Sequence, residues 1–166
     1  MREMKVAHSL FYLPENASEV AIFTTNGVVK KDGRAVLGAG IAKEANALFH
    51  VDELLGKYLK EYGNRPFYMG RFYRNDTDGV RREMSLASFP TKHHWREKSD
   101  ITLITKSAIH LVEMADKFGW TKIYMPPVGC GLGQLNFNCT VKPVLQGILD
   151  DRFITVFGQA SEPFSR

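Results

Sequence analysis

Cysteine is scarce in this sequence: only two occur among its 166 residues, at positions 130 and 139. Two cysteines cannot build the disulfide framework of a small secreted protein, and their spacing is not that of a zinc site. Long apolar runs are also absent, and no apolar core follows the charged residues 1–5 as it would in a leader sequence. These absences predict a reduced, cytoplasmic protein without a membrane anchor.

Long runs of like charge are absent as well. Lysine and arginine number 22 against 18 acidic residues, so the net charge is +4, but the basic residues are spread along the chain. Such an excess favours a negatively charged partner and suits a phosphate-bearing ligand or a weak, salt-sensitive contact with nucleic acid. The hydrophobic fraction of 44% is that of an ordinary globular protein. One domain over residues 1–166 is expected from this length.

Three glycines at alternate positions, Gly129, Gly131 and Gly133, mark the loop around which the chain is organised. The loop follows an apolar run at 122–125, which is typical of a strand, and precedes a helix expected at 141–149. Backbone without Cβ atoms can close on a ligand, and loop amides before a helix favour an anion. The spacing matches neither a P-loop nor a dinucleotide fingerprint, so a tight strand-to-helix turn is an equal alternative.

A second loop of small residues, Gly38-Ala39-Gly40-Ile41-Ala42, follows a strand expected at 19–25 and leads into helices expected at 43–49 and 51–62. Ligands of open α/β sheets bind at the carboxyl ends of strands. Both small-residue loops are therefore predicted to face one crevice.

The remaining segments continue the alternation of strands and helices. Strands are expected at 4–8, 67–73, 83–89 and 152–157, a helix at 100–118 with Ser99 as its N-cap, and a loose tail at 158–166. This pattern predicts an α/β layered domain with helices on both faces of the sheet.

Two polar residues at strand ends could carry chemistry. Asn26 offers a neutral donor and acceptor that could hold sugar hydroxyls, although a turn residue beside Gly27 is the alternative. Lys92 could be partly desolvated, which would lower its pKa and let the amine act as a base or nucleophile toward a sugar carbon. The alternative for Lys92 is a solvated surface charge.

The neighbouring polar and reactive side chains are expected to be structural. His93 and His94 have no cysteine or carboxylate at metal-ligand spacing, so no metal site is predicted. Trp95 and Arg96 are expected to serve packing and surface charge. Cys130 has no local acid–base pair and is expected to be a small buried residue.

Taken together, these motifs resemble the macro domain family, whose fold binds ADP-ribose. The resemblance runs from about residue 19 to 157 and rests on four signatures in the family's order: Thr25-Asn26-Gly27 with loop 38–42; the segment Phe89-Pro90-Thr91-Lys92-His93-His94-Trp95-Arg96-Glu97-Lys98-Ser99; loop 129–135; and 141–143 with 151–153. It implies a three-layer α/β/α domain with a mixed central sheet. The ligand-binding residues that it implies are Thr25, Asn26, Gly38, Ala39, Gly40, Ile41, Ala42, Val128, Gly129, Cys130, Gly131, Leu132, Gly133, Gln134 and Leu135.

Within the family the chain is similar to the branch that contains the DarG antitoxin, which removes ADP-ribose from thymidine in DNA, and the terminal ADP-ribose protein glycohydrolase. Many macro domains hold the adenine amino group with an acidic residue, and that position falls near Ser9 here. The protein-acting enzyme has an aspartate where this chain has Gly133, whereas resembling DNA-acting members also have glycine. Residues 28–36 lengthen the first loop.

The resemblance also implies a function. The domain would bind ADP-ribose or an ADP-ribosylated macromolecule and hydrolyse the bond between the distal ribose and a nucleic-acid or protein acceptor. The family's catalytic lysine falls on Lys92, and Asn26 would orient the ribose; neither a metal nor another cofactor is implied. Two alternatives are a phosphatase acting on ADP-ribose 1″-phosphate and a non-catalytic module that binds ADP-ribose derivatives.

Overall fold

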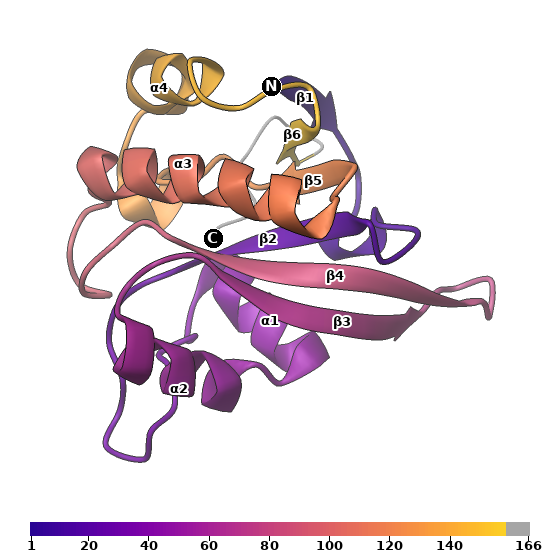
Figure 1. Cartoon of the computed structure of the whole chain (residues 1–166), viewed down its shortest axis with the longest axis horizontal. Coiled ribbons are helices and arrows are strands. Elements are labelled where there is room, and N and C mark those ends of the chain that lie inside the picture. The colour runs from indigo at the N-terminus through magenta and orange to yellow at the C-terminus, as the bar shows by residue number, and fades with distance from the viewer. Residues whose placement is uncertain (159–166) are drawn as a thin grey trace.

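A six-stranded mixed sheet forms the centre of the computed structural model, which describes residues 1–158 (Figure 1). The strand order is β1-β6-β5-β2-β4-β3, and only the β3–β4 pair is antiparallel. The strands are β1 (Arg2–Lys5), β2 (Glu19–Thr25), β3 (Phe67–Asn75), β4 (Arg81–Pro90), β5 (Lys122–Met125) and β6 (Phe153–Phe157). The expected mixed α/β architecture is confirmed. Most of the tail expected at 158–166 lies outside the described residues.

Helices cover both faces of the sheet because both faces of its central strands are apolar. Ala21 and Phe23 of β2 pack against the helices α1 (Gly40–Phe49) and α2 (Asp52–Tyr62). The alternate residues Val20 and Ile22 join the opposite core, which includes side chains of α3 (Ile101–Phe118) and α4 (Lys142–Gln146). Successive strand side chains point to opposite faces, so β2 divides the two cores (Figure 1).

The starts of the helices α1 and α3 differ from the expected ones. The helix α1 begins at Gly40, because the Lys43 amide donates to the Ala39 carbonyl at 3.2 Å and closes a first turn within the small-residue loop. The N-cap of α3 is Asp100, whose carboxylate accepts from the Thr102 amide at 2.9 Å. Ser99 is therefore not the cap.

The last expected helix, 141–149, is much shorter in the structure. A π-helical turn, Phe137–Val141, comes first, and α4 itself spans only Lys142–Gln146 before Gly147. Pro143 lies in the first turn, where its missing N–H breaks no helical hydrogen bond.

None of the helices in residues 1–158 combines the length and the apolar character that crossing a bilayer requires.

Candidate functional site

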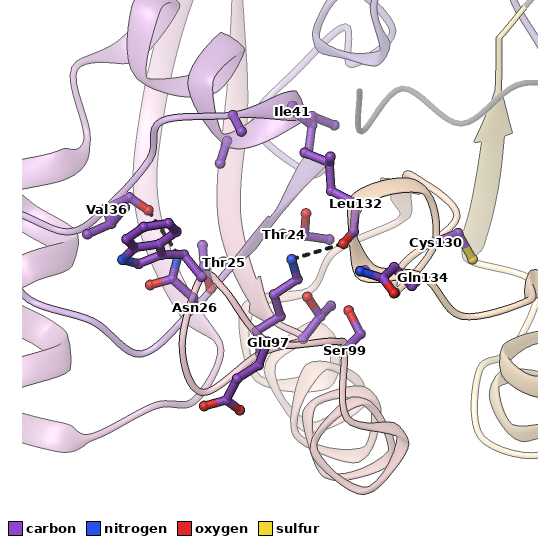
Figure 2. A pocket seen from close by; sticks show the side chains of 18 of the residues that line it. Thr24, Thr25, Asn26, Val36, Ile41, Glu97, Ser99, Cys130, Leu132 and Gln134 are labelled. Atoms are coloured by element: carbon purple, nitrogen blue, oxygen red, sulfur yellow. Dashed lines mark hydrogen bonds between the residues drawn. The ribbon is translucent and has the colours of Figure 1, made fainter.

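A cavity of about 610 Å³ lies at the carboxyl ends of β2, β4 and β5. Its walls are the first small-residue loop, the segment after β4 and the second glycine loop, as expected for ligands of open α/β sheets. Figure 2 shows Ile41 of the first loop and Leu132 of the second on neighbouring parts of this wall. The two loops that the sequence predicted to share a crevice are thus brought together.

The structure places most, but not all, of the expected binding residues at this cavity. Those that line it are Thr25, Asn26, Gly38, Ala39, Gly40, Ile41, Ala42, Gly129, Cys130, Leu132, Gly133 and Gln134, together with Lys92. Val128 is fully buried and Leu135 packs against the same core, so neither side chain lines the cavity. Gly131 is also outside the lining, where its φ of +62° shapes the turn between Cys130 and Leu132.

Backbone hydrogen bonds join the loops around the cavity. The Thr91 amide donates to the Thr25 carbonyl at 3.0 Å, and the Gly27 amide donates to the His93 carbonyl at 3.2 Å. On the other side, the Ser99 amide donates to the Gly133 carbonyl at 2.9 Å. The segment after β4 is therefore held between the two small-residue loops by backbone hydrogen bonds, which order the backbone that carries its side chains.

Lys92 is held at the centre of this arrangement. Lys92 is half-buried and lines the cavity, and its Nζ donates to the Leu132 carbonyl at 3.2 Å, the hydrogen bond that is dashed at Leu132 in Figure 2. Burial lowers the pKa of the Lys92 amine, because removal from water disfavours the charged form. The Lys92 carbonyl accepts from Nδ2 of Asn64 at 2.9 Å, which anchors the backbone of the lysine. Lys92 is therefore a partly desolvated amine rather than a fully solvated surface charge.

Asn26 uses its amide group to organise the first loop. Nδ2 donates to the Val36 carbonyl at 3.1 Å (Figure 2), and Oδ1 accepts from the Val28 amide at 3.0 Å. These contacts close the chain on either side of the insert 28–36 and correspond to the turn alternative. Each amide atom keeps one further hydrogen-bonding position, so contact of Asn26 with a ribose stays a prediction.

The insert 28–36 is a small hairpin that rests on α2. Val29 and Ala35 form an isolated antiparallel bridge, and the Ala35 amide donates to the Asp52 carbonyl at 2.9 Å. Only Val36 of this segment lines the cavity. The insert therefore supports the first loop rather than covering the site.

Gly133 and Ser99 pack closely at the floor of the site. A Cβ atom on Gly133 would lie 2.2 Å from Ser99 Oγ and 4.0 Å from Lys92 Cε. The Ser99 hydroxyl is buried and has no hydrogen-bond partner within the described residues. It fills the space that a side chain at position 133 would need, which explains why this chain has glycine there.

Cys130 is buried in the cavity wall. Its thiol donates to the Val128 carbonyl at 3.5 Å, and burial raises the pKa of the thiol to about 11. The thiol is therefore protonated near neutral pH and is not a nucleophile. This agrees with the small buried residue that the sequence predicted.

The carboxylate of Glu44 lies beside Ser9, the position near which many macro domains have an acidic residue. The Ser9 hydroxyl donates to Oε1 of Glu44, which comes from the second turn of α1. Neither residue lines the cavity, although Gly40 and Ile41 one turn earlier do.

Several residues of the cavity wall were not expected from the sequence. They are Thr24, Val36, Thr91, Trp95, Arg96, Glu97, Ser99 and Pro127. Trp95 and Arg96 had been expected to serve packing and surface charge. The signal that could have found them was their position in the same signature segment as Lys92. No group of three or more His, Cys, Asp or Glu side chains suited to a metal ion occurs between residues 1 and 158.

Comparison with known proteins identifies relatives of this arrangement. No family model matches the chain. The DNA ADP-ribosyl glycohydrolase of Mycobacterium tuberculosis strain ATCC 25618 / H37Rv is 28% identical over 103 residues, which cover 62% of this chain and 29% of the relative. This chain thus matches less than a third of that relative's length.

Solved structures extend the likeness to nearly the whole chain. The macrodomain of Thermus aquaticus DarG is 25% identical with a TM-score of 0.65, covering 93% of this chain and 96% of that one. Thermosipho africanus DarTG in complex with ADP-ribose has a TM-score of 0.71 at 21% identity, covering 95% of this chain and 42% of that one. The macro domain fold and the likeness to DarG are confirmed.

Proposed function

We propose that this chain, which has the fold of the DarG macrodomains, binds ADP-ribose in the cavity and hydrolyses the bond between the distal ribose and an acceptor in DNA. The observation that carries the proposal is Lys92, an amine of lowered pKa held inside a cavity bounded by small-residue loops. The names of the relatives as DNA ADP-ribosyl glycohydrolases support DNA as the acceptor.

The loops provide the binding part of the proposal. Gly38 and Gly129 contribute to the cavity wall, and α1, ten residues long, begins at Gly40 in the same wall. Backbone amides and a helix N-terminus both favour anions, so the diphosphate is assigned to this side. The distal ribose then lies toward Asn26 and Lys92.

Lys92 provides the chemical part. A neutral amine can attack the anomeric carbon of the ribose directly, or it can take a proton from a water that attacks there. In the first route the amine bonds to the anomeric carbon as the bond to the acceptor breaks and the acceptor leaves with a proton; water then hydrolyses the ribosyl-lysine bond and restores the amine. In the second route the water itself displaces the acceptor, which leaves with the proton that the lysine has taken up. Both routes require loss of the ammonium proton, which a lowered pKa makes easier.

The setting and extent of the domain belong to the same proposal. The low cysteine content supports a reducing, cytoplasmic environment, and the net charge of +4 supports a weak contact with nucleic acid. Residues 1–166 are proposed to form a single domain.

The test is a turnover assay on three substrates side by side: ADP-ribosylated single-stranded DNA, ADP-ribosylated protein and ADP-ribose 1″-phosphate. Release of ADP-ribose from DNA is the expected result. Release of phosphate from the third substrate alone would identify a phosphatase. Tight calorimetric binding of ADP-ribose without turnover of any substrate would identify a binding module, and the hydrolase proposal would be wrong.

A further inference from the structure

Trp95 is exposed to an unusual degree for a tryptophan at a cavity. It is 44% exposed and lines the cavity, whereas the chain's other tryptophan, Trp120, is 3% exposed. A large aromatic surface left in water at the rim of a binding site indicates a partner that covers it.

The backbone around Trp95 is ordered by local hydrogen bonds. The Glu97 amide donates to the His94 carbonyl and the Arg96 amide to His94 Nδ1, both at 3.1 Å. His93 Nε2 lies 2.8 Å from Oδ2 of Asp100, the N-cap of α3. The backbone that carries Trp95 is therefore ordered before a ligand binds, which reduces the conformational entropy lost on binding.

The surroundings of the indole ring suit a planar ligand linked to phosphates. The Arg96 guanidinium carbon lies 4.6 Å from the ring centroid, and the His94 ring stacks at 5.2 Å with an interplanar angle of 28°. Lys98 adds a further exposed positive charge to the segment, against the single carboxylate of Glu97. An aromatic face flanked by cations is the arrangement with which proteins bind single-stranded nucleic acid.

We infer that His94, Trp95 and Arg96 form a stacking platform for the nucleobase that carries the ADP-ribose or for its neighbour in a single strand. The inference rests on the proposed function, because the acceptor must leave the cavity beside the catalytic group. Trp95 lines the same cavity as Lys92, only three positions away in the sequence, so the platform lies where that acceptor emerges. Because every base has a π-face, the platform favours a nucleic-acid acceptor over a protein side chain and tolerates different base sequences.

The kinetic test compares Trp95→Ala, Trp95→Phe and the unchanged protein. The substrates are a single-stranded oligodeoxynucleotide with ADP-ribose on one base and an ADP-ribosylated protein. Trp95→Ala is expected to lower kcat/KM for the oligonucleotide about tenfold or more, since stacking is lost. Its affinity for free ADP-ribose, measured by calorimetry, should change less than about threefold, and Trp95→Phe should restore most of the rate.

Two kinetic results would overturn the platform. One is an unchanged kcat/KM for the oligonucleotide in Trp95→Ala. The other is an equal loss of affinity for free ADP-ribose, because Trp95 would then contact the ADP-ribosyl group itself. Lys98→Ala is the matched control: it removes a positive charge from the same segment but not from the cavity wall, and it should change oligonucleotide turnover only modestly and mainly at low salt.

A second measurement needs no turnover and so separates this inference from the proposed function. Trp95 supplies the exposed indole, so an unmodified single-stranded oligonucleotide at low salt should quench the protein's fluorescence, and Trp95→Phe should remove the quenching. Quenching that persists in Trp95→Phe, or none in the unchanged protein, would overturn the platform. If none of the three turnover substrates is hydrolysed but the quenching depends on Trp95, the hydrolase proposal would be wrong and the platform would stand.

Discussion

Lys92 combines two properties that a lysine on the open surface lacks. Its amine is desolvated enough for its pKa to fall, and it is held by the Leu132 carbonyl at 3.2 Å. The hydrogen bond to the carbonyl favours the ammonium form, whereas burial favours the neutral amine. Burial has the larger effect, because the pKa is lowered. The ammonium proton of Lys92 is therefore lost more easily than that of a lysine on the open surface.

Replacing Lys92 with alanine should lower the turnover rate of ADP-ribosylated DNA about 100-fold or more. The affinity for ADP-ribose should stay within about tenfold of that of the unchanged protein. The loops supply most of the ground-state binding, and the amine acts mainly in the transition state. Lys92→Arg should also be inactive, because a guanidinium keeps its proton.

The pH dependence of turnover follows from the same shift. The neutral amine is the active form, so kcat/KM should rise with pH through a pKa below the ordinary range for lysine and then level off. Steady-state kinetics across this range check the expectation. Full activity in Lys92→Ala would contradict the lysine mechanism and move attention to Asn26 or a ligand-bound water.

Gly133 should resist even a small side chain, because its Cβ would lie 2.2 Å from Ser99 Oγ. Gly133→Ala is expected to lower the thermal midpoint and reduce turnover by displacing Ser99 and the second loop. The double variant Gly133→Ala with Ser99→Gly should recover the midpoint, since the clashing hydroxyl and its Cβ are gone. Thermal unfolding of the four combinations measures this coupling. Additive losses would show that the two positions do not compete for one space.

The helices and strands followed from local pattern, but their boundaries did not. Ser99 and Asp100 are both good N-cap types and adjacent, so the sequence could not choose between them. The choice depends on the Ser99 amide, which pairs with the distant Gly133 carbonyl, and on Asp100, which caps Thr102.

Part of the candidate site could also be predicted from the sequence. Lys92 and the glycine loops were found because motif, strand end and resemblance agreed. Trp95 was not found: it stands in the same segment as Lys92, but a single sequence shows neither its exposure nor its place in the cavity wall. The resemblance implied that Val128 binds the ligand, whereas its side chain is fully buried and packs in the core.

The β3–β4 hairpin extends beyond the body of the domain and is held by an ionic cluster near its turn (Figure 1). Asp76 accepts from Arg74 Nε at 2.7 Å and from Arg82 Nε. Arg74, with a side chain only 7% exposed, also donates to the carbonyls of Tyr12 and Pro14. The cluster therefore ties the hairpin to the segment before β2.

Asp76→Asn should lower the free energy of unfolding by about 1–3 kcal/mol, because the enclosed Arg74 loses its counter-ion. Asp78→Asn, which removes the more exposed pair with Arg82, is the matched control and should cost about 0–1 kcal/mol. Denaturant unfolding measures both. An equal loss of unfolding free energy in the two variants would show that the Arg74–Asp76 pair contributes no more than the exposed Arg82–Asp78 pair.

The hydrogen bond from Arg74 lowers the pKa of the Asp76 carboxyl, with a further contribution from Arg82. A carboxyl whose pKa is lowered on folding stabilises the protein above its ordinary pKa, and this contribution is lost as pH falls through the folded value. The difference between wild type and Asp76→Asn should therefore be full near neutral pH and shrink below about pH 4.

Across the whole molecule, the net charge of +4 is distributed rather than gathered in one long run. Unmodified DNA should consequently bind weakly and only at low salt, because phosphate contacts release counter-ions that added salt replaces. An ADP-ribosylated oligonucleotide should lose much less affinity as salt rises, since the cavity holds its modification. Fluorescence anisotropy at several salt concentrations, with a Lys92→Ala protein to prevent turnover, gives the comparison. Tight, salt-resistant binding of unmodified DNA would indicate a different function.

The pairing of β1 with β6 places Arg2 opposite Ile154 and so joins the two ends of the described chain. On the ribosome, β1 must therefore stay unpaired until β6 has emerged. The β2–β4 and β3–β4 pairs can form earlier and already bring Thr25 beside Pro90, next to Lys92. One rim of the cavity can thus be assembled before the β1 edge of the sheet, which is completed only after β6 has been synthesised.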